Sequence, residues 1–165
     1  MSTRSRSRLF SFTVVVVAAG IAVSPAAAIV DESSRGPNAY VSPPTRAERA
    51  AKAALSTVGT PYRWGGESPT NGFDCSGLVR WAYARVGVEL PHNSYALYGE
   101  GRRVLETRME VGDILFFEGL GHVGLYLGNG RMVHSPQTGR NVEVVRLDAT
   151  NYGARLIGAR RVVAS

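Results

Sequence analysis

The chain has a single cysteine, Cys75, among its 165 residues. One cysteine cannot form an internal disulfide, so the fold must be held together by its own hydrophobic core. Paired zinc ligands of the C-x-x-C type are also missing, which makes a zinc site built from Cys75 and two histidines the weaker alternative. No cluster of Lys and Arg is interleaved with aromatic residues, so nucleic-acid binding gains no support. We expect neither a metal nor a cofactor.

The sequence also lacks the long apolar run of a membrane-spanning helix. The apolar stretch from Leu9 to Val23 is shorter than the roughly 20 residues needed to cross a bilayer, and Gly20 interrupts it. Three arginines precede this stretch and an Ala-x-Ala pattern follows it at residues 26–28. This order is typical of a secretory signal peptide over residues 1–28. We expect a secreted protein with no stable membrane insertion after cleavage.

Basic residues outnumber acidic ones only modestly once this leader is removed. The full chain has 19 Lys and Arg against 13 Asp and Glu, and three of the basic residues lie in the leader, which leaves 16 against 13. Such a balance suits contact with an anionic cell envelope, and it equally describes an ordinary solvated surface.

The rest of the chain predicts one domain. Residues 29–44 are rich in Pro, Ser and charge, which indicates a linker, and residues 45–165 have the usual size of a single domain. Helical patterns come first in it, with a capping box at 45–48 opening a helix to Val58 and a second helix over residues 75–86. Helices followed by consecutive strands predict an α+β domain with a mainly antiparallel sheet. The expected strands cover residues 113–117, 122–127, 131–134, 141–147 and 157–163.

Cys75 lies where a Gly-rich loop gives way to the second helical pattern. The N–H groups and the positive dipole end of a helix N-terminus stabilise a thiolate, so we expect Cys75 to titrate below its free value and to act as a nucleophile. The alternative is a small buried hydrophobe, since free cysteines are often buried. Its polar neighbours Asp74 and Ser76 favour the nucleophile.

Two histidines occupy neighbouring strands of the predicted sheet. His122 begins one strand, and His134 ends the strand that follows a Gly-Asn-Gly turn. A three-residue loop would place the two imidazoles on the same face, within reach of each other. A two-residue loop closed by Gly128 and Arg131 would send them to opposite faces. In the first arrangement His122 can take the thiol proton and His134 can orient it, which gives a Cys-His-His triad. The alternative for each is a structural histidine, and for His134 one hydrogen-bonded to backbone.

Two further polar residues are weaker candidates. Ser76 lacks the G-x-S-x-G surroundings of a serine nucleophile. His92 follows a proline in a loop and is expected to be a solvated turn residue.

Several motifs, in this order, make the chain resemble the NlpC-like cysteine peptidases. The resemblance spans the predicted domain and implies a bacterial, papain-like α+β fold, with the nucleophile at a helix N-terminus packed against the sheet that carries the base. It also implies a cell-wall location and a substrate, the stem peptides of peptidoglycan cut between D-γ-glutamate and the diamino acid. The motifs are Tyr62-Arg63-Trp64-Gly65-Gly66, Phe73-Asp74-Cys75-Ser76-Gly77-Leu78-Val79, Leu90-Pro91, Val111-Gly112-Asp113-Ile114-Leu115-Phe116-Phe117, His122-Val123-Gly124-Leu125-Tyr126-Leu127-Gly128 and Met132-Val133-His134-Ser135-Pro136.

Position by position, the resemblance implies catalytic roles for Cys75 as nucleophile, His122 as base and His134 as third polar residue. Tyr62 matches a tyrosine near the thiol that binds substrate or the oxyanion.

The same resemblance implies that Asp74 and Ser76 shape the substrate pocket on the S2 side, with a helix cap as the alternative for Asp74. The chain departs from many relatives at His92 and Leu97, where a basic residue and a glutamine are common.

Two other functions compete with the peptidase. One is amidase or acyltransferase chemistry on the same fold, and the other is a wall-binding module without turnover. We expect a monomer whose partner is the peptidoglycan peptide.

Overall fold

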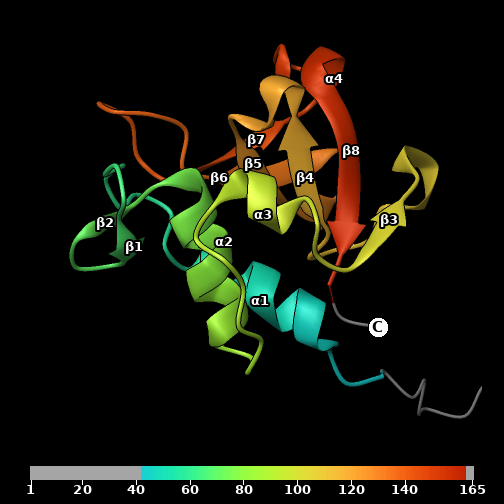
Figure 1. Cartoon of the computed structure of the whole chain (residues 1–165), viewed down its shortest axis with the longest axis horizontal. Helices are drawn as coiled ribbons and strands as arrows, with labels where there is room; N and C mark the ends of the chain where they lie inside the picture. The colour runs from blue at the N-terminus through green and yellow to red at the C-terminus, as the bar shows by residue number, and fades with distance from the viewer. Residues whose placement is uncertain (1–41, 163–165) are drawn as a thin grey trace, which may run out of the picture. The chain divides into compact units, whose positions relative to one another are not determined.

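The first helix, α1 (Arg46–Leu55), begins at the predicted capping box. The computed structural model describes residues 42–162, so the predicted signal peptide and most of the predicted linker lie outside the described residues. Thr45 Oγ accepts a hydrogen bond from the Glu48 N–H, and the Glu48 carboxylate accepts one from the Thr45 N–H. The buried side of α1 consists of alanines, which let it pack closely against α2 (Cys75–Ala84) (Figure 1). None of the helices in this part of the chain has the length and apolar character needed to cross a membrane.

A short hairpin of β1 (Glu67–Ser68) and β2 (Gly72–Phe73) leads into α2. Asp74 is the N-cap of that helix, and its side chain accepts a hydrogen bond from the Gly77 N–H at 2.7 Å. The helix ends at Ala84, two residues before the predicted end. Cys75 therefore occupies the first helical position, as predicted.

The second half of the chain forms a six-stranded antiparallel sheet in the order β3-β8-β4-β5-β6-β7 (Figure 1). This confirms the predicted α+β class, although β3 and the β1–β2 hairpin were not predicted. Short helices lie between these strands and, in the case of α3, between α2 and β3. The strands are β3 (Arg102–Val104), β4 (Ile114–Phe117), β5 (Val123–Gly128), β6 (Arg131–His134), β7 (Glu143–Arg146) and β8 (Leu156–Arg161); the short helices are α3 (Ser94–Leu97), α4 (Tyr152–Arg155) and the 3₁₀ turns η2 (Glu106–Arg108) and η3 (Glu118–Leu120).

The β5–β6 hairpin combines the two alternatives that the sequence left open. Gly128 pairs with Arg131, so the turn itself has two residues, but Leu125 pairs with Val133. Leu127 is an extra residue that shifts the register between these pairs, which is a β-bulge. The bulge restores the phase of a three-residue loop, so His134 comes opposite Gly124, where an added Cβ would lie 3.2 Å from the His134 Cβ. The two histidines consequently share a face.

Strand β4 lies in the middle of the core and is buried on both faces. Ile114 and Phe116 pack in the cluster that includes α1 and α2, whereas Leu115 and Phe117 pack in the cluster on the other face. This division follows from the alternation of side chains along a strand. Both faces of the sheet are therefore covered at β4.

A buried ion pair ties the start of β4 to the end of β8. Arg161 donates from Nε and Nη2 to the two carboxylate oxygens of Asp113, both at 2.7 Å. The preceding Gly112 has φ +94°, and an added Cβ would overlap the carbonyl group of Ala47 on α1. Its own carbonyl accepts a hydrogen bond from the Tyr83 hydroxyl on α2 at 2.7 Å. These contacts fix the two helices against the start of β4, the strand that pairs with β5.

Candidate active site

Cys75 faces a cavity of about 260 Å³ between α2 and the sheet. His122, just before β5, lines the same cavity, so the structure brings together the predicted nucleophile and the predicted base. Tyr62, Asp74 and Ser76 also line it. A larger cavity of about 460 Å³ lies beside Thr45 and Arg161, but no cysteine or histidine lines it. The smaller cavity is therefore the candidate active site.

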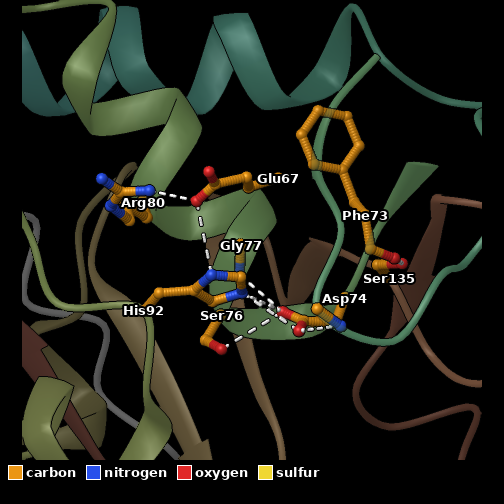
Figure 2. A network of polar contacts seen from close by, with 9 residues as sticks. Glu67, Phe73, Asp74, Ser76, Gly77, Arg80, His92 and Ser135 are labelled. Atoms are coloured by element: carbon orange, nitrogen blue, oxygen red, sulfur yellow. Dashed lines mark hydrogen bonds and ion pairs between the residues drawn. The ribbon is translucent and has the colours of Figure 1, made fainter. Parts of the chain in front are cut away.

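The Asp74 carboxylate organises one wall of this cavity (Figure 2). Besides capping α2, it accepts hydrogen bonds from the Gly65 N–H at 2.9 Å and from Ser76 Oγ at 3.2 Å. His92 Nε2 lies 2.9 and 3.0 Å from its two oxygens. The helix-cap role of Asp74 is confirmed, and its oxygens hold three separate segments together.

His92 is not the solvated turn residue that the sequence predicted. Its side chain is only 24% exposed, and its Nδ1 lies 3.4 Å from Oε2 of Glu67, which in turn pairs with Arg80 (Figure 2). The prediction failed because the contacts are tertiary: the β1–β2 hairpin and the start of α2 meet His92 from distant parts of the sequence. No local signal near Pro91 indicates them.

The expected low pKa of Cys75 is wrong for this structure. Burial raises the pKa of the Cys75 thiol, and the Asp74 carboxylate raises it further. The backbone N–H groups of Val123, Ser76 and Cys75 itself act in the opposite direction, which is the effect that the helix N-terminus predicted, but they do not outweigh burial. At rest Cys75 is accordingly a neutral thiol.

His122 and His134 form the predicted pair. Nε2 of His122 lies 2.8 Å from Nδ1 of His134, and the rings meet edge to face with centroids 5.0 Å apart. His134 is fully buried. Its Nε2 makes no hydrogen bond in the described chain, but Oε1 of Glu143 lies 3.5 Å from it. Glu143 also accepts two hydrogen bonds from Arg140, at 2.7 and 2.6 Å.

This chain of contacts favours one tautomer of each ring. A carboxylate only accepts hydrogen bonds, so Glu143 favours the proton on Nε2 of His134. Nδ1 of His134 is then an acceptor, and it takes the hydrogen bond that Nε2 of His122 donates. The remaining nitrogen of His122, Nδ1, is left with a free lone pair. His122 therefore has the form that a general base requires.

Burial keeps both histidines neutral. It lowers the pKa of His122 to about 3, with further contributions from His134 and Arg155. It lowers the pKa of His134 to about 4, with a contribution from Arg140. Tyr62, next to the thiol, has its pKa raised by burial, Cys75 and Asp74, so its hydroxyl stays protonated and can donate.

Three aromatic side chains at this site were not found from the sequence. Trp64, 87% exposed, and Tyr95 line the cavity. Tyr152, on α4, stacks on the His122 ring with centroids 5.5 Å apart. An exposed aromatic residue has no periodic signal, and no helix was predicted over residues 152–155.

A cysteine at a helix N-terminus that shares a cavity with a histidine of an antiparallel sheet defines the class of the cysteine peptidases. Residues 59–161 match the model of the NlpC/P60 family, which is more than half of the chain. The chain belongs to the NlpC/P60 family, and the resemblance seen in its sequence is confirmed.

Curated relatives match over this domain. The chain is 48% identical over 107 residues to "Probable endopeptidase Rv2190c" of Mycobacterium tuberculosis, which covers 63% of this chain and 28% of that protein. It is 36% identical over 130 residues to murein DD-endopeptidase MepH of Escherichia coli, covering 72% and 48%. It is 43% identical over 98 residues to the bifunctional muramidase/DL-endopeptidase CwlT of Bacillus subtilis, covering 56% and 30%. The chain thus spans less than half the length of these relatives.

Solved structures share the fold. An NlpC/P60 family protein from Bacillus cereus superposes with a TM-score of 0.69 at 33% identity, covering 74% of this chain and 42% of that chain. The NlpC/p60 domain of the peptidoglycan hydrolase SagA superposes with a TM-score of 0.63 at 31% identity, covering 70% of this chain and 97% of that chain.

The two neutral histidines predict a pH-dependent stability. Each has an ordinary pKa near 6.5 when unfolded and a much lower one when folded, so below pH 6.5 the unfolded chain binds protons that the folded chain does not. Stability is therefore lost as the pH falls, by about 2 kcal/mol per histidine between pH 7 and pH 5. Urea unfolding at both pH values measures this loss. His122→Gln and His134→Gln should each reduce the stability lost between pH 7 and pH 5 by about half. An equal loss of stability in the parent and in both variants would contradict the assignment of the pH dependence to these two histidines.

Proposed function

We propose that this chain is a secreted cysteine endopeptidase that hydrolyses stem peptides of peptidoglycan at the bond between D-γ-glutamate and the diamino acid. The observation that carries the proposal is the shared cavity of Cys75 and His122, with His134 hydrogen-bonded behind the base. The similar proteins support the substrate class, since their names include a murein endopeptidase and a peptidoglycan hydrolase. Because peptidoglycan lies outside the cytoplasm, the enzyme acts there.

The reaction proceeds by acyl transfer in two steps. Nδ1 of His122 takes the Cys75 proton as the sulfur attacks the amide carbonyl, and the resulting imidazolium gives that proton to the leaving amine. Water then attacks the thioester with His122 again as base, which releases the carboxylate product and restores the thiol. The Cys75 N–H and the Tyr62 hydroxyl stabilise the oxyanion in both steps.

His134 acts through His122, because it accepts the hydrogen bond that leaves Nδ1 basic. Asp74 and Ser76 form the substrate-side wall through their mutual hydrogen bond. Because the Asp74 oxygens already accept four donors, this wall contributes shape and negative charge near a substrate amine. We propose that the enzyme works as a monomer without metal or cofactor.

The names of the relatives support two different bonds, since one is a DD-endopeptidase and another a DL-endopeptidase. The test uses two purified muropeptides. An uncrosslinked tetrapeptide monomer contains the D-γ-glutamyl bond and no crosslink, whereas a crosslinked dimer contains both. Mass spectrometry of the products then identifies the bond.

We expect the monomer to be cut after D-γ-glutamate. Conversion of the dimer to intact monomers, with the monomer itself untouched, would replace the proposed bond with the crosslink. No cleavage of either by folded, reduced protein would overturn the peptidase and favour the wall-binding module, which a muropeptide binding assay would detect.

A further inference from the structure

Tyr152 is placed against the catalytic histidines by a tightly held turn. Tyr152 is the first residue of α4, which lies between β7 and β8. Two hydrogen bonds fix the turn before it: the Gly153 N–H donates to the Leu147 carbonyl at 3.1 Å, and Thr150 Oγ1 donates to the Arg146 carbonyl at 3.0 Å. A Cβ at Gly153 would lie 2.8 Å from that Leu147 oxygen, so any larger residue would push α4 away from the sheet. The position of Tyr152 is therefore set by its backbone.

The Tyr152 ring contacts both imidazoles. It stacks on His122 with the ring planes 29° apart, and it meets His134 edge to face with centroids 5.0 Å apart. Phe117 completes the cluster, with its ring centroid 5.1 Å from that of Tyr152 and 5.7 Å from that of His122. The Tyr152 hydroxyl makes no hydrogen bond to His122, His134 or Phe117 in the described part of the chain, so the ring of Tyr152 makes the contact with the histidines.

The hydrogen bond to His134 holds the Nε2 atom of His122 in place, but it does not fix the plane of the imidazole ring. Rotation of the ring about its Nε2 atom would swing the Nδ1 lone pair away from the thiol. A flat ring stacked on the imidazole face opposes this rotation. We propose that Tyr152 is a positioning residue that holds the plane of the His122 ring so that Nδ1 stays directed at the reaction centre; this rests on the proposed catalytic role of His122.

The test compares four variants of the full chain. Tyr152→Leu removes the stacked ring, and Tyr152→Phe keeps the ring and removes only the hydroxyl. Leu156→Ala is the matched packing control, because Leu156 and Tyr152 pack against the same core cluster. Tyr152→Met refills the volume with a flexible side chain, and it carries the same expectation as Tyr152→Leu if that variant fails to fold.

We expect Tyr152→Leu to lower kcat by about 10- to 100-fold with little change in KM, because a misdirected base costs rate without costing binding. Tyr152→Phe should stay within about twofold of the parent, the conservative rescue expected of a ring contact. Leu156→Ala should lower the Tm and leave kcat near that of the parent.

Alkylation of Cys75 by iodoacetamide supplies a readout that needs no peptide substrate. Its rate at pH 7 should fall in Tyr152→Leu and persist in Tyr152→Phe. The pH profile of this rate should also change, since water entering beside the ring raises the pH at which His122 is protonated. The titratable and charged groups around that ring, His134 on β6, Arg155 on α4 and Cys75 on α2, are unchanged in these variants.

Parent-like rates in Tyr152→Leu would overturn the inference, and so would equal losses in Tyr152→Leu and Leu156→Ala, because the effect would then be packing alone. If the parent cleaves no muropeptide but the alkylation rates separate as expected, the proposed substrate fails and the role of Tyr152 stands.

Discussion

Cys75→Ala is expected to abolish peptide hydrolysis while the protein stays folded. The variant removes the only thiol of the chain, so the covalent route is lost and kcat should fall by at least about 10⁴-fold. Cys75 is partly buried at the edge of the core, and truncation to alanine should cost no more than about 1 kcal/mol of unfolding free energy. Turnover of the tetrapeptide muropeptide, followed by mass spectrometry, measures the activity, and urea unfolding measures the stability.

The single cysteine makes the control unambiguous. Iodoacetamide should add one label per parent chain and none to Cys75→Ala, and labelling should remove activity in proportion. Cys75→Ser is the matched variant, since it keeps a hydrogen-bonding atom of nearly the same size but a much weaker nucleophile. Substantial turnover by Cys75→Ala would assign the chemistry to another residue, with the adjacent Ser76 hydroxyl the first to test.

His122→Gln is expected to lower kcat/KM by about 10³-fold and to change how the rate depends on pH. In the parent, His122 is neutral at pH 7 because its pKa is lowered to about 3, so activity should persist well below pH 6.5. In the variant, only thiol that has ionised unaided can attack. Because the Cys75 pKa is raised, the residual rate should climb by up to tenfold per pH unit through neutral pH.

The comparison variant is His134→Gln, whose side-chain oxygen can still accept the hydrogen bond from His122. We expect a smaller loss and a parent-like shape of the pH profile. Initial rates between pH 4 and pH 9, with folding checked at each pH, give both profiles. Identical losses and identical profiles in the two glutamine variants would contradict the assignment of His122 as the base.

Local sequence signals predicted the elements that carry the site. The capping box at Thr45 and the polar start of α2 at Asp74 each satisfy backbone groups nearby, so a short stretch of sequence determines them. Runs of residues that favour strands likewise predicted β4, β5 and β6, and their order after the helices predicted the antiparallel sheet. Placement of Cys75 at a helix N-terminus and of both histidines on one hairpin followed from these elements.

The sequence could not predict properties that depend on distant contacts. The pKa of Cys75 is set by how deeply the thiol is buried, which only the packed structure determines, and the local helix effect pointed in the wrong direction. His92 and Tyr152 contact the site from the loop after α2 and from α4, elements far from their partners along the chain. The bulge at Leu127 was not predicted either, because a two-residue turn and the register of a three-residue loop were treated as alternatives.

The bulge at Leu127 takes up the one residue by which this hairpin exceeds a regular ladder closed by a two-residue turn. Deleting Leu127 would leave Gly128 opposite Arg131 and Tyr126 opposite Met132, so His134 would still come opposite Gly124. A slip of the ladder by one residue, in contrast, would carry His134 to the opposite face of the sheet. The hairpin can therefore change its length by one residue at the bulge without separating the two histidines, whereas its register cannot change.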